Sequence, residues 1–170
     1  MRPEQNFARM MKARGLSIAF AESMSCGYLS HKIGSISSTS DIFKGAIICN
    51  DKSVKTNLMG LSETLIKKHT AESQVITDKL VRKLKLLIKA DVHASITGLA
   101  SEGGSENRNK PVGTVYYSVL YKNKLTRKKK QFRGSPLEIK KRSCAFLFSF
   151  ISKICSLNTV FYKLINFKIK

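Results

Sequence analysis

The apolar run of residues 18–21 ends abruptly at Glu22-Ser23, and a small polar turn follows it. Residues 24–33 have the pattern of a helix, so this segment predicts a buried strand that turns sharply into a helix. Active sites in open α/β sheets lie at the carboxyl ends of strands, which is where we expect Ser23. A helix start offers free backbone N–H groups and a positive dipole end, so the turn favours an oxyanion or a phosphate.

Apolar runs and helical stripes alternate along the rest of the chain. Helices are expected before Gly15, over residues 24–33, 51–58 and 136–150, and after Ser73, which is a candidate N-cap. Strands are expected over residues 18–21, 45–49 and 92–97, and a hairpin over residues 112–121 and 125–132. This order predicts an α/β fold, a three-layer α/β/α sandwich in which the late hairpin makes the sheet mixed. At 170 residues the chain can bury a core without disulfides or metals.

The formal net charge of +20 is unusual and would attract phosphorylated metabolites, nucleic acid or other polyanions. Many of the basic residues fall in the predicted hairpin: Lys122, Lys124, Arg127, Lys128, Lys129, Lys130 and Arg133. Aromatic residues do not interleave this run, so we interpret it as a solvated edge strand. Nucleic-acid binding stays open but has no motif to support it.

The cysteines and histidines indicate neither a disulfide framework nor a metal site. Cys26, Cys49, Cys144 and Cys155 have no regular spacing, and His31, His69 and His93 are scattered. We therefore expect free thiols, no metal and no cofactor. Because no apolar secretory core opens the chain, we also expect a cytoplasmic location.

The end of the chain is rich in Phe, Ile and Leu. Lys153 interrupts this apolar run, and a membrane-spanning helix needs about 20 consecutive apolar residues. We therefore expect no membrane partner, a single domain over residues 1–157, and a basic and apolar tail over residues 158–170 whose role is unassigned.

Three blocks of sequence resemble the CinA C-terminal domain, the nicotinamide-nucleotide amidase family. Ala21-Glu22-Ser23-Met24-Ser25-Cys26-Gly27 resembles its A-E-S-C-T-G-G signature. Residues 43–62, which include Gly45 and Lys55, resemble F-x-G-G-V-V…K…L-L-G-V-S. Residues 90–115 resemble A-D-x-A-x-x-x-T-G-I-A-G-P…G-G…K-P-V-G-T-V. The blocks follow the family's order and cover about residues 5 to 150.

The resemblance implies the same fold and a reaction. The family hydrolyses the carboxamide of nicotinamide mononucleotide, giving nicotinic acid mononucleotide and ammonia. By position, Ser23 is then the nucleophile, Lys55 the base, and backbone N–H groups around residues 24–26 the oxyanion hole. The substrate, a small nucleotide, would contact Ser25, Gly27, Gly45, Asn50, Thr97, Gly98, Gly103 and Gly104.

Alternatives remain at each of these positions. Without the resemblance, Ser23 reads as a helix cap and Lys55 as one of many solvated lysines, and Cys26 is a rival nucleophile. The chain also departs from the family pattern. Asn50 stands where the family has tyrosine, Cys26 where it has glycine, Ser101-Glu102 where it has G-P, and Pro136 where it has arginine.

Two functions therefore stand from the sequence. The first is a nicotinamide-nucleotide amidase, weakened or intact. The alternative is a catalytically inactive relative that binds a nucleotide or polyanion, or a chain whose site has eroded without function. A homo-oligomer stays open.

Overall fold

The structure is a computed structural model that describes the backbone of residues 2–167 and the side chains of residues 2–156. Its elements follow in the order α1 (Pro3–Ala13), β1 (Ile18–Glu22), α2 (Tyr28–Gly34), β2 (Phe43–Ile48), the short π-helix η1 (Val54–Leu58), α3 (Glu63–His69), α4 (Gln74–Leu87), β3 (Val92–Gly98), β4 (Thr114–Tyr121), β5 (Lys124–Gln131) and α5 (Pro136–Phe167).

The strands form one mixed sheet in the order β2-β1-β3-β4-β5. β1 pairs in parallel with both β2 and β3, whereas β4 and β5 continue the sheet as an antiparallel hairpin. The strand order reverses at β1, because β2 lies on one side of β1 and β3 on the other. The carboxyl ends of β1, β2 and β3 therefore share one edge, where open α/β sheets bind their ligands.

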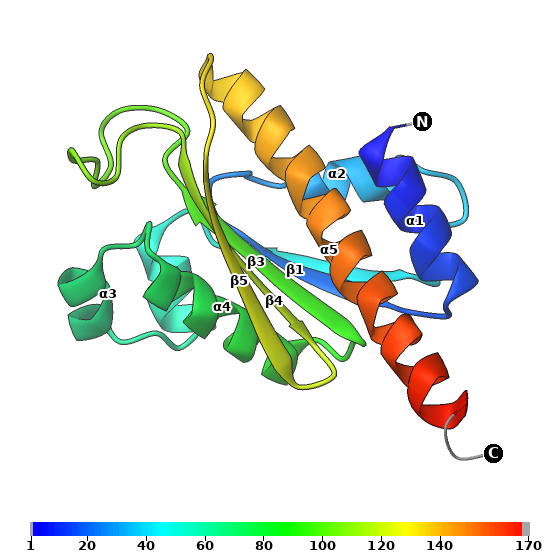
Figure 1. Ribbon diagram of the computed structural model, residues 1–170. Helices are drawn as coiled ribbons and strands as arrows, with labels where there is room; N and C mark the ends of the chain where they lie inside the picture. Colours follow the sequence, from blue (N-terminus) through cyan, green and yellow to red (C-terminus); the bar gives the residue numbers. More distant parts are fainter. Residues whose placement is uncertain (1, 168–170) are drawn as a thin grey trace.

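Helices cover both faces of the sheet, which confirms the predicted three-layer α/β/α fold (Figure 1). α1, α2 and α5 pack on one face, and α4 with α3 packs on the other. Alternation along β1 serves both layers. Ile18 and Phe20 join the core under α1, α2 and α5, whereas Ala19 and Ala21 join the core under α4.

The helix predicted to start at residue 24 begins only at Tyr28, so that prediction is wrong. Cys26 has φ 50° and Gly27 has φ 88°, both in the left-handed region. Residues 24–27 therefore form a turn instead of the first turn of the helix. Non-glycine residues seldom adopt this conformation, and nothing in the residue pattern announces it at Cys26.

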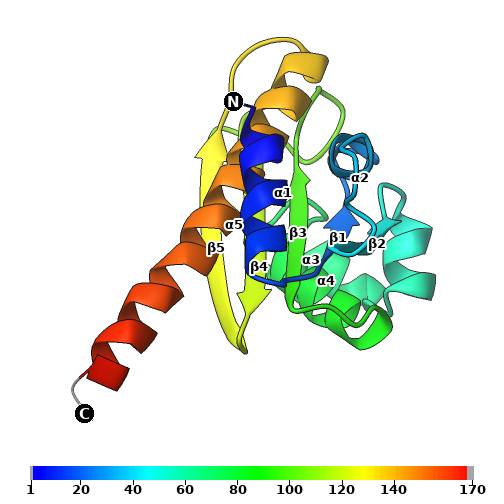
Figure 2. The same cartoon turned by 90° about the vertical axis from the view of Figure 1, so that its right-hand side faces the viewer.

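The C-terminal helix was predicted to end at Phe150 but continues to Phe167. It begins at Pro136 as predicted, a position that proline favours. Its far turns extend beyond the sheet (Figure 2). The predicted tail was residues 158–170, and the last three of these, 168–170, lie outside the described residues. Among the described residues, no helix is long and apolar enough to cross a membrane.

The hairpin of β4 and β5 has the expected form, and β5 is an edge strand with mostly exposed side chains. One helix was missed. α3 has a single buried residue, Ile66, so it carries too little apolar pattern to be seen in the sequence.

Candidate functional site

A cavity of about 260 Å³ opens at the shared carboxyl edge of β1, β2 and β3. Its walls come from the turn after β1, the segment after β2, the segment between α3 and α4, the loop after β3 and the first turns of α5. Five predicted residues line it: Cys26, Asn50, Gly98, Gly103 and Gly104. Four further residues line the cavity although the sequence did not predict them as substrate contacts: Met24, Glu72, Glu102 and Lys140.

Glu22 organises the turn after β1 from within. Its side chain is fully buried, and one carboxylate oxygen accepts hydrogen bonds from the Ser25 hydroxyl at 2.7 Å and the Gly27 amide at 3.0 Å. The same oxygen accepts the Leu29 amide, and the other accepts the amide and hydroxyl of Ser30. A buried carboxylate needs this many donors because it has lost its hydration.

The first amides of α2 are therefore not free for a substrate anion, which corrects the expectation from the sequence. Gly27, Leu29 and Ser30 give their N–H groups to Glu22. The Cys26 N–H donates to the carbonyl oxygen of Ser23. Among the described residues, the Met24 and Ser25 N–H groups make no hydrogen bond, so this pair remains for an oxyanion.

Ser23 is the residue directly after β1. Its N–H donates to the carbonyl oxygen of Ile96 at 3.1 Å, which holds the turn against β3. The side chain is 5 % exposed, and within the described part of the chain its hydroxyl has no hydrogen-bond partner. The interpretation of Ser23 as a helix cap is wrong, because α2 begins behind Gly27 without a side-chain cap.

Lys55 lies in η1, 1 % exposed. Its Nζ donates to the carbonyl oxygen of Cys49 at 2.6 Å and to that of Asn50 at 2.8 Å. Burial lowers the pKa of the ammonium group below its ordinary value of 10.5. Lys55 is therefore not the solvated surface lysine that the composition allowed.

A short chain of contacts connects Glu22, the residue before Ser23, with Lys55. The Cys49 N–H donates to the carbonyl oxygen of Glu22 at 2.7 Å, which joins the ends of β1 and β2. The Cys49 carbonyl oxygen in turn accepts from Lys55. Ser23 therefore directly follows β1, and Lys55 of η1 is bonded to the residues that follow β2, but neither side chain lines the cavity.

The loop after β3 forms the opposite wall. A side chain at Gly98 would place its Cβ 2.5 Å from the carbonyl oxygen of Thr114, so only glycine fits there. The Gly103 and Gly104 N–H groups each donate to one carboxylate oxygen of Glu106, both at 2.8 Å. These bonds lower the pKa of Glu106. The two amides predicted to hold the nucleotide are thus occupied by a carboxylate of the loop itself.

Lys110 fastens this loop to the segment between α3 and α4. It is nearly buried, and its Nζ donates to the Thr70 hydroxyl at 2.7 Å, to the Glu72 carbonyl oxygen at 3.1 Å and to the Ser105 hydroxyl. The Ser105 hydroxyl donates to the Glu72 carboxylate. Desolvation lowers the pKa of Lys110. The cluster holds the carboxylate of Glu72 at the cavity wall.

Four predicted contact residues are not among those that line the cavity, although the Ser25 N–H lies in the turn at its wall. Ser25 and Gly27 are bound to Glu22 as described, and Gly45 lies early in β2, opposite Ala19. Thr97 is fully buried and its hydroxyl shares a 2.7 Å hydrogen bond with that of Thr77. These residues shape the strands and the turn around the site.

The sequence does not predict the role of several site residues. Glu22 enters only as part of the signature, and no role is predicted for Glu72 and Glu106. Sequence spacing could have hinted at Glu106, because a carboxylate two or three residues after Gly-Gly can reach back to their amides. No local signal announces the contact of Lys110 with Thr70, 40 residues away.

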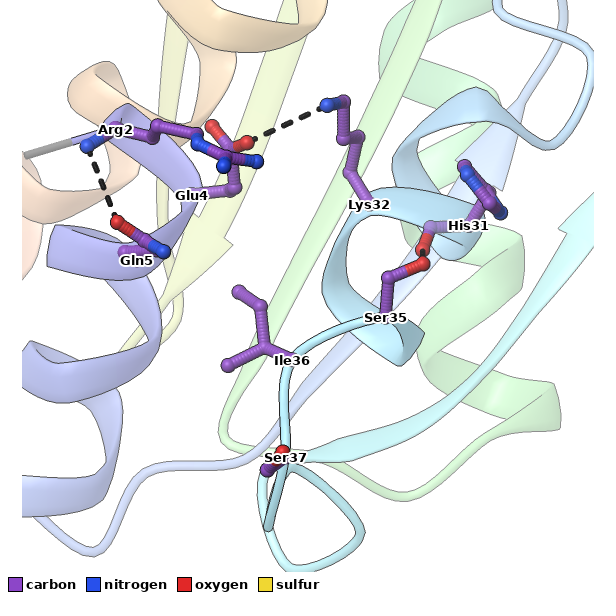
Figure 3. Close-up of a pocket in the computed structure, with 8 residues that line it drawn as sticks. All are labelled: Arg2, Glu4, Gln5, His31, Lys32, Ser35, Ile36 and Ser37. Carbon is purple, nitrogen blue, oxygen red and sulfur yellow. Dashed lines mark hydrogen bonds and ion pairs between the residues drawn. The ribbon is translucent and has the colours of Figure 1, made fainter.

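A larger cavity lies elsewhere, between α1 and α2 (Figure 3). Its volume is about 490 Å³, and its lining includes Arg2, Glu4, His31 and Lys32. Glu4 forms an ion pair with Lys32 across it at 3.4 Å. It shares no residue with the predicted site. Among the described residues, no cluster of His, Cys, Asp or Glu is suited to a metal ion.

Comparison with known proteins gives one consistent result. The family described as "CinA C-terminal domain" matches residues 2–155. A CinA-like protein of Pseudothermotoga lettingae is 32% identical over 117 residues, and one of Prochlorococcus marinus subsp. pastoris is 38% identical over 120 residues. These alignments cover 68% and 70% of this chain but only 28% of each relative, so the chain spans less than a third of their length.

Solved structures show the same fold. The competence damage-inducible protein A of Klebsiella pneumoniae superposes with a TM-score of 0.85 at 19% identity, over 92% of this chain and 98% of that one. A competence-damaged protein superfamily member from Escherichia coli gives 0.80 at 18% identity, over 89% and 87% of the two chains.

Proposed function

Because this chain belongs to the CinA C-terminal domain family, we propose that it hydrolyses the carboxamide of nicotinamide mononucleotide to nicotinic acid mononucleotide and ammonia. The observation that carries the proposal is the pair of Ser23 and Lys55. An unbonded serine hydroxyl directly follows β1, and a buried lysine with a lowered pKa is bonded to the residues that follow the neighbouring strand β2; the approach of the two side chains to each other is part of the proposal. Amide hydrolysis without a metal needs such a nucleophile and base.

In the first step Ser23 Oγ attacks the carboxamide carbon while its proton passes to the neutral Lys55 amine. A neutral amine has two N–H bonds and one lone pair. Lys55 has two carbonyl acceptors, Cys49 and Asn50, so its two N–H bonds are used and its lone pair is left to take the proton. The negative charge on the former carbonyl oxygen is held by the Met24 and Ser25 N–H groups.

In the second step the tetrahedral intermediate collapses and the C–N bond breaks. The Lys55 ammonium returns the proton to the leaving nitrogen, which departs as ammonia and leaves an ester on Ser23. Water then attacks the ester, giving up a proton to Lys55. Cleavage of the C–O bond returns that proton to Ser23 Oγ and releases the carboxylic acid product.

The test is incubation of the chain with nicotinamide mononucleotide while ammonia and the acid product are measured together. We expect equal amounts of both products from the wild type. Ser23→Ala should release neither, whereas Cys26→Ala should stay active. An inactive Cys26→Ala with an active Ser23→Ala would move the nucleophile to Cys26, whose thiol is exposed beside the cavity.

The second candidate function is nucleotide binding without turnover, because the charges of the cavity oppose the placement of a substrate phosphate that turnover would need. The carboxylates of Glu72 and Glu102 line it, Glu106 holds the Gly103 and Gly104 amides, and Lys140 is the one cationic side chain among its lining residues. Calorimetric titration with the same nucleotide distinguishes the two. Binding without ammonia release supports the second function and excludes the first.

A further inference from the structure

A second surface of the molecule is a groove with an apolar floor and a basic rim. A groove of about 440 Å³ runs between the edge strand β5 and helix α5. Phe146, Phe150 and Ile154 of α5 line it together with Lys128 and Lys130 of β5 and Lys153 of α5. The groove shares no residue with the cavity at the carboxyl edge of the sheet.

The floor exists because α5 carries two apolar stripes. Leu147 and Ile151 are fully buried against the sheet, whereas Phe146 and Phe150, one position before, are only half-buried and face β5. The rings of Phe146 and Phe150 stack with their centroids 5.7 Å apart and an interplanar angle of 17°. A second stripe of this kind leaves apolar surface that the fold itself does not cover.

The rim follows from alternation along β5. Arg127 points to the other face, where its Nε lies 2.6 Å from a carboxylate oxygen of Asp78, while Lys128 and Lys130 border the groove. Among the described residues, Lys128, Lys130 and Lys153 form no ion pair. The Lys130 ammonium lies 5.3 Å from the centre of the Phe146 ring.

The rest of α5 has the same character. From Ile139 to Phe167 the sequence of α5 contains five lysines and arginines and no Asp or Glu, and the acidic residue of the helix is Glu138 in its first turn. Phe, Leu and Ile alternate with these charges to the end of the chain, and the helix extends past the sheet (Figure 2). A helix that carries basic and apolar residues and almost no acidic ones is typical of helices that lie on anionic membranes.

Single-stranded nucleic acid and an anionic lipid surface both fit the positive charge, and the apolar floor of the groove distinguishes between them. Single-stranded nucleic acid needs aromatic faces on which bases stack. The Phe146 ring already packs against three other rings and the Lys130 ammonium, which competes with base stacking, and Ile154 has no π-face. A lipid suits the groove better, because an acyl chain packs on Phe and Ile while its anionic head group meets lysines.

We propose that the face formed by β5 and α5 docks on bilayers of anionic phospholipid, with one lipid seated in this groove. The sequence had led us to expect no membrane partner because no segment is long enough to span one. Attachment at the surface does not need a spanning segment.

The absence of tryptophan from the chain allows a specific test. The full chain is made as Phe150→Trp, and as Leu86→Trp, which places the probe on α4 where Leu86 is 78% exposed. On vesicles of phosphatidylcholine mixed with phosphatidylglycerol, we expect a blue shift for Phe150→Trp and none for Leu86→Trp. On phosphatidylcholine alone neither should shift. No shift of Phe150→Trp on anionic vesicles would overturn the proposal.

Co-sedimentation with the same vesicles tests the lysines. Changing Lys128, Lys130 and Lys153 together to serine should weaken binding roughly 100-fold, the scale expected for three lysines at an anionic surface. The control changes Lys68, Lys79 and Lys89, exposed residues on or beside α3 and α4, to serine with the same loss of charge.

Three results would overturn the docking proposal. The first is an equal loss in the control variant, which means that net charge alone attracts the chain. The second is a Phe150→Trp shift that grows with protein concentration without lipid, which means that a second copy fills the groove. The third is a larger shift with a single-stranded oligonucleotide than with anionic vesicles.

Discussion

The Nζ atom of Lys55 lies 2.6 Å from the carbonyl oxygen of Cys49, the residue directly after β2. Since Cys49 is itself bonded to the end of β1, the position of the amine is set by the sheet and not by a flexible loop. A base held in this way loses little entropy when it accepts a proton in the reaction.

If Lys55 is the base, turnover should rise with pH. Only the neutral amine accepts a proton, and burial lowers its pKa, so kcat/KM should rise through an inflection below 10.5. Lys55→Ala should lose about 10²- to 10⁴-fold in rate, the usual contribution of a general base. Lys55→Arg should lose as much, because arginine does not give up its proton.

The pH profile of amidase activity checks this, with Lys52→Arg as the matched control. Lys52 is an exposed neighbour that pairs with Glu63, and its replacement should leave the profile unchanged. An active Lys55→Arg enzyme would remove the base role and leave an electrostatic one.

Glu22→Gln should destabilise the fold by about 3 kcal/mol. The buried carboxylate accepts five hydrogen bonds, and an amide would turn an N–H group toward donors that need an acceptor. Urea unfolding followed by circular dichroism measures the loss. Glu63→Gln, at an exposed site, should leave the midpoint where it is. A wild-type midpoint for Glu22→Gln would mean that the turn after β1 does not depend on this charge.

Glu106→Gln should lower KM for nicotinamide mononucleotide and change kcat little. The ionised carboxylate holds the Gly103 and Gly104 amides and competes with a phosphate for them. Steady-state kinetics checks the expectation. Glu102→Gln removes a charge from the same cavity without touching these amides. An equal effect of both variants would indicate general repulsion, and an unchanged KM in Glu106→Gln would place the phosphate elsewhere.

Cys26→Gly should stabilise the chain by about 0.5–1 kcal/mol. Cys26 has φ 50°, where a side chain is strained by roughly 1–2 kcal/mol and glycine is not, although glycine gains entropy when unfolded. Thermal unfolding compares it with Cys26→Ala, which retains a Cβ and should gain nothing. Equal stability of the two variants would show that the neighbouring turn relieves the strain.

The strands were predictable because their apolar runs are short, buried and bounded by polar turns, as in residues 18–21 before Glu22. The α/β layering followed from their order. The start of α2 was not predictable, since it depends on a buried carboxylate that binds the amides of Gly27, Leu29 and Ser30. Helix propensity contains no information about such a contact.

The candidate site was predictable where residues lie at strand ends and unpredictable where it depends on distant contacts. Ser23 directly follows β1, so topology brings it to the carboxyl edge, whereas Lys55 lies in η1 and is tied to that edge by its bond to Cys49. The bond from Lys110 to Thr70 joins residues 40 apart, and no local pattern encodes it. The departure from the family pattern at Glu102 was visible in the sequence, but only the structure shows that this residue lines the cavity.

The Glu22 carboxylate points inward, which distinguishes a structural role of the surrounding signature from a catalytic one. Its five bonds are all to the chain's own amides and hydroxyls, so the acidic residue of Ala21-Glu22-Ser23 serves the turn. A chain that had lost all turnover would still gain stability from this residue. The signature therefore reports ancestry and architecture, and whether such a chain is an enzyme must be read from residues that the fold can do without.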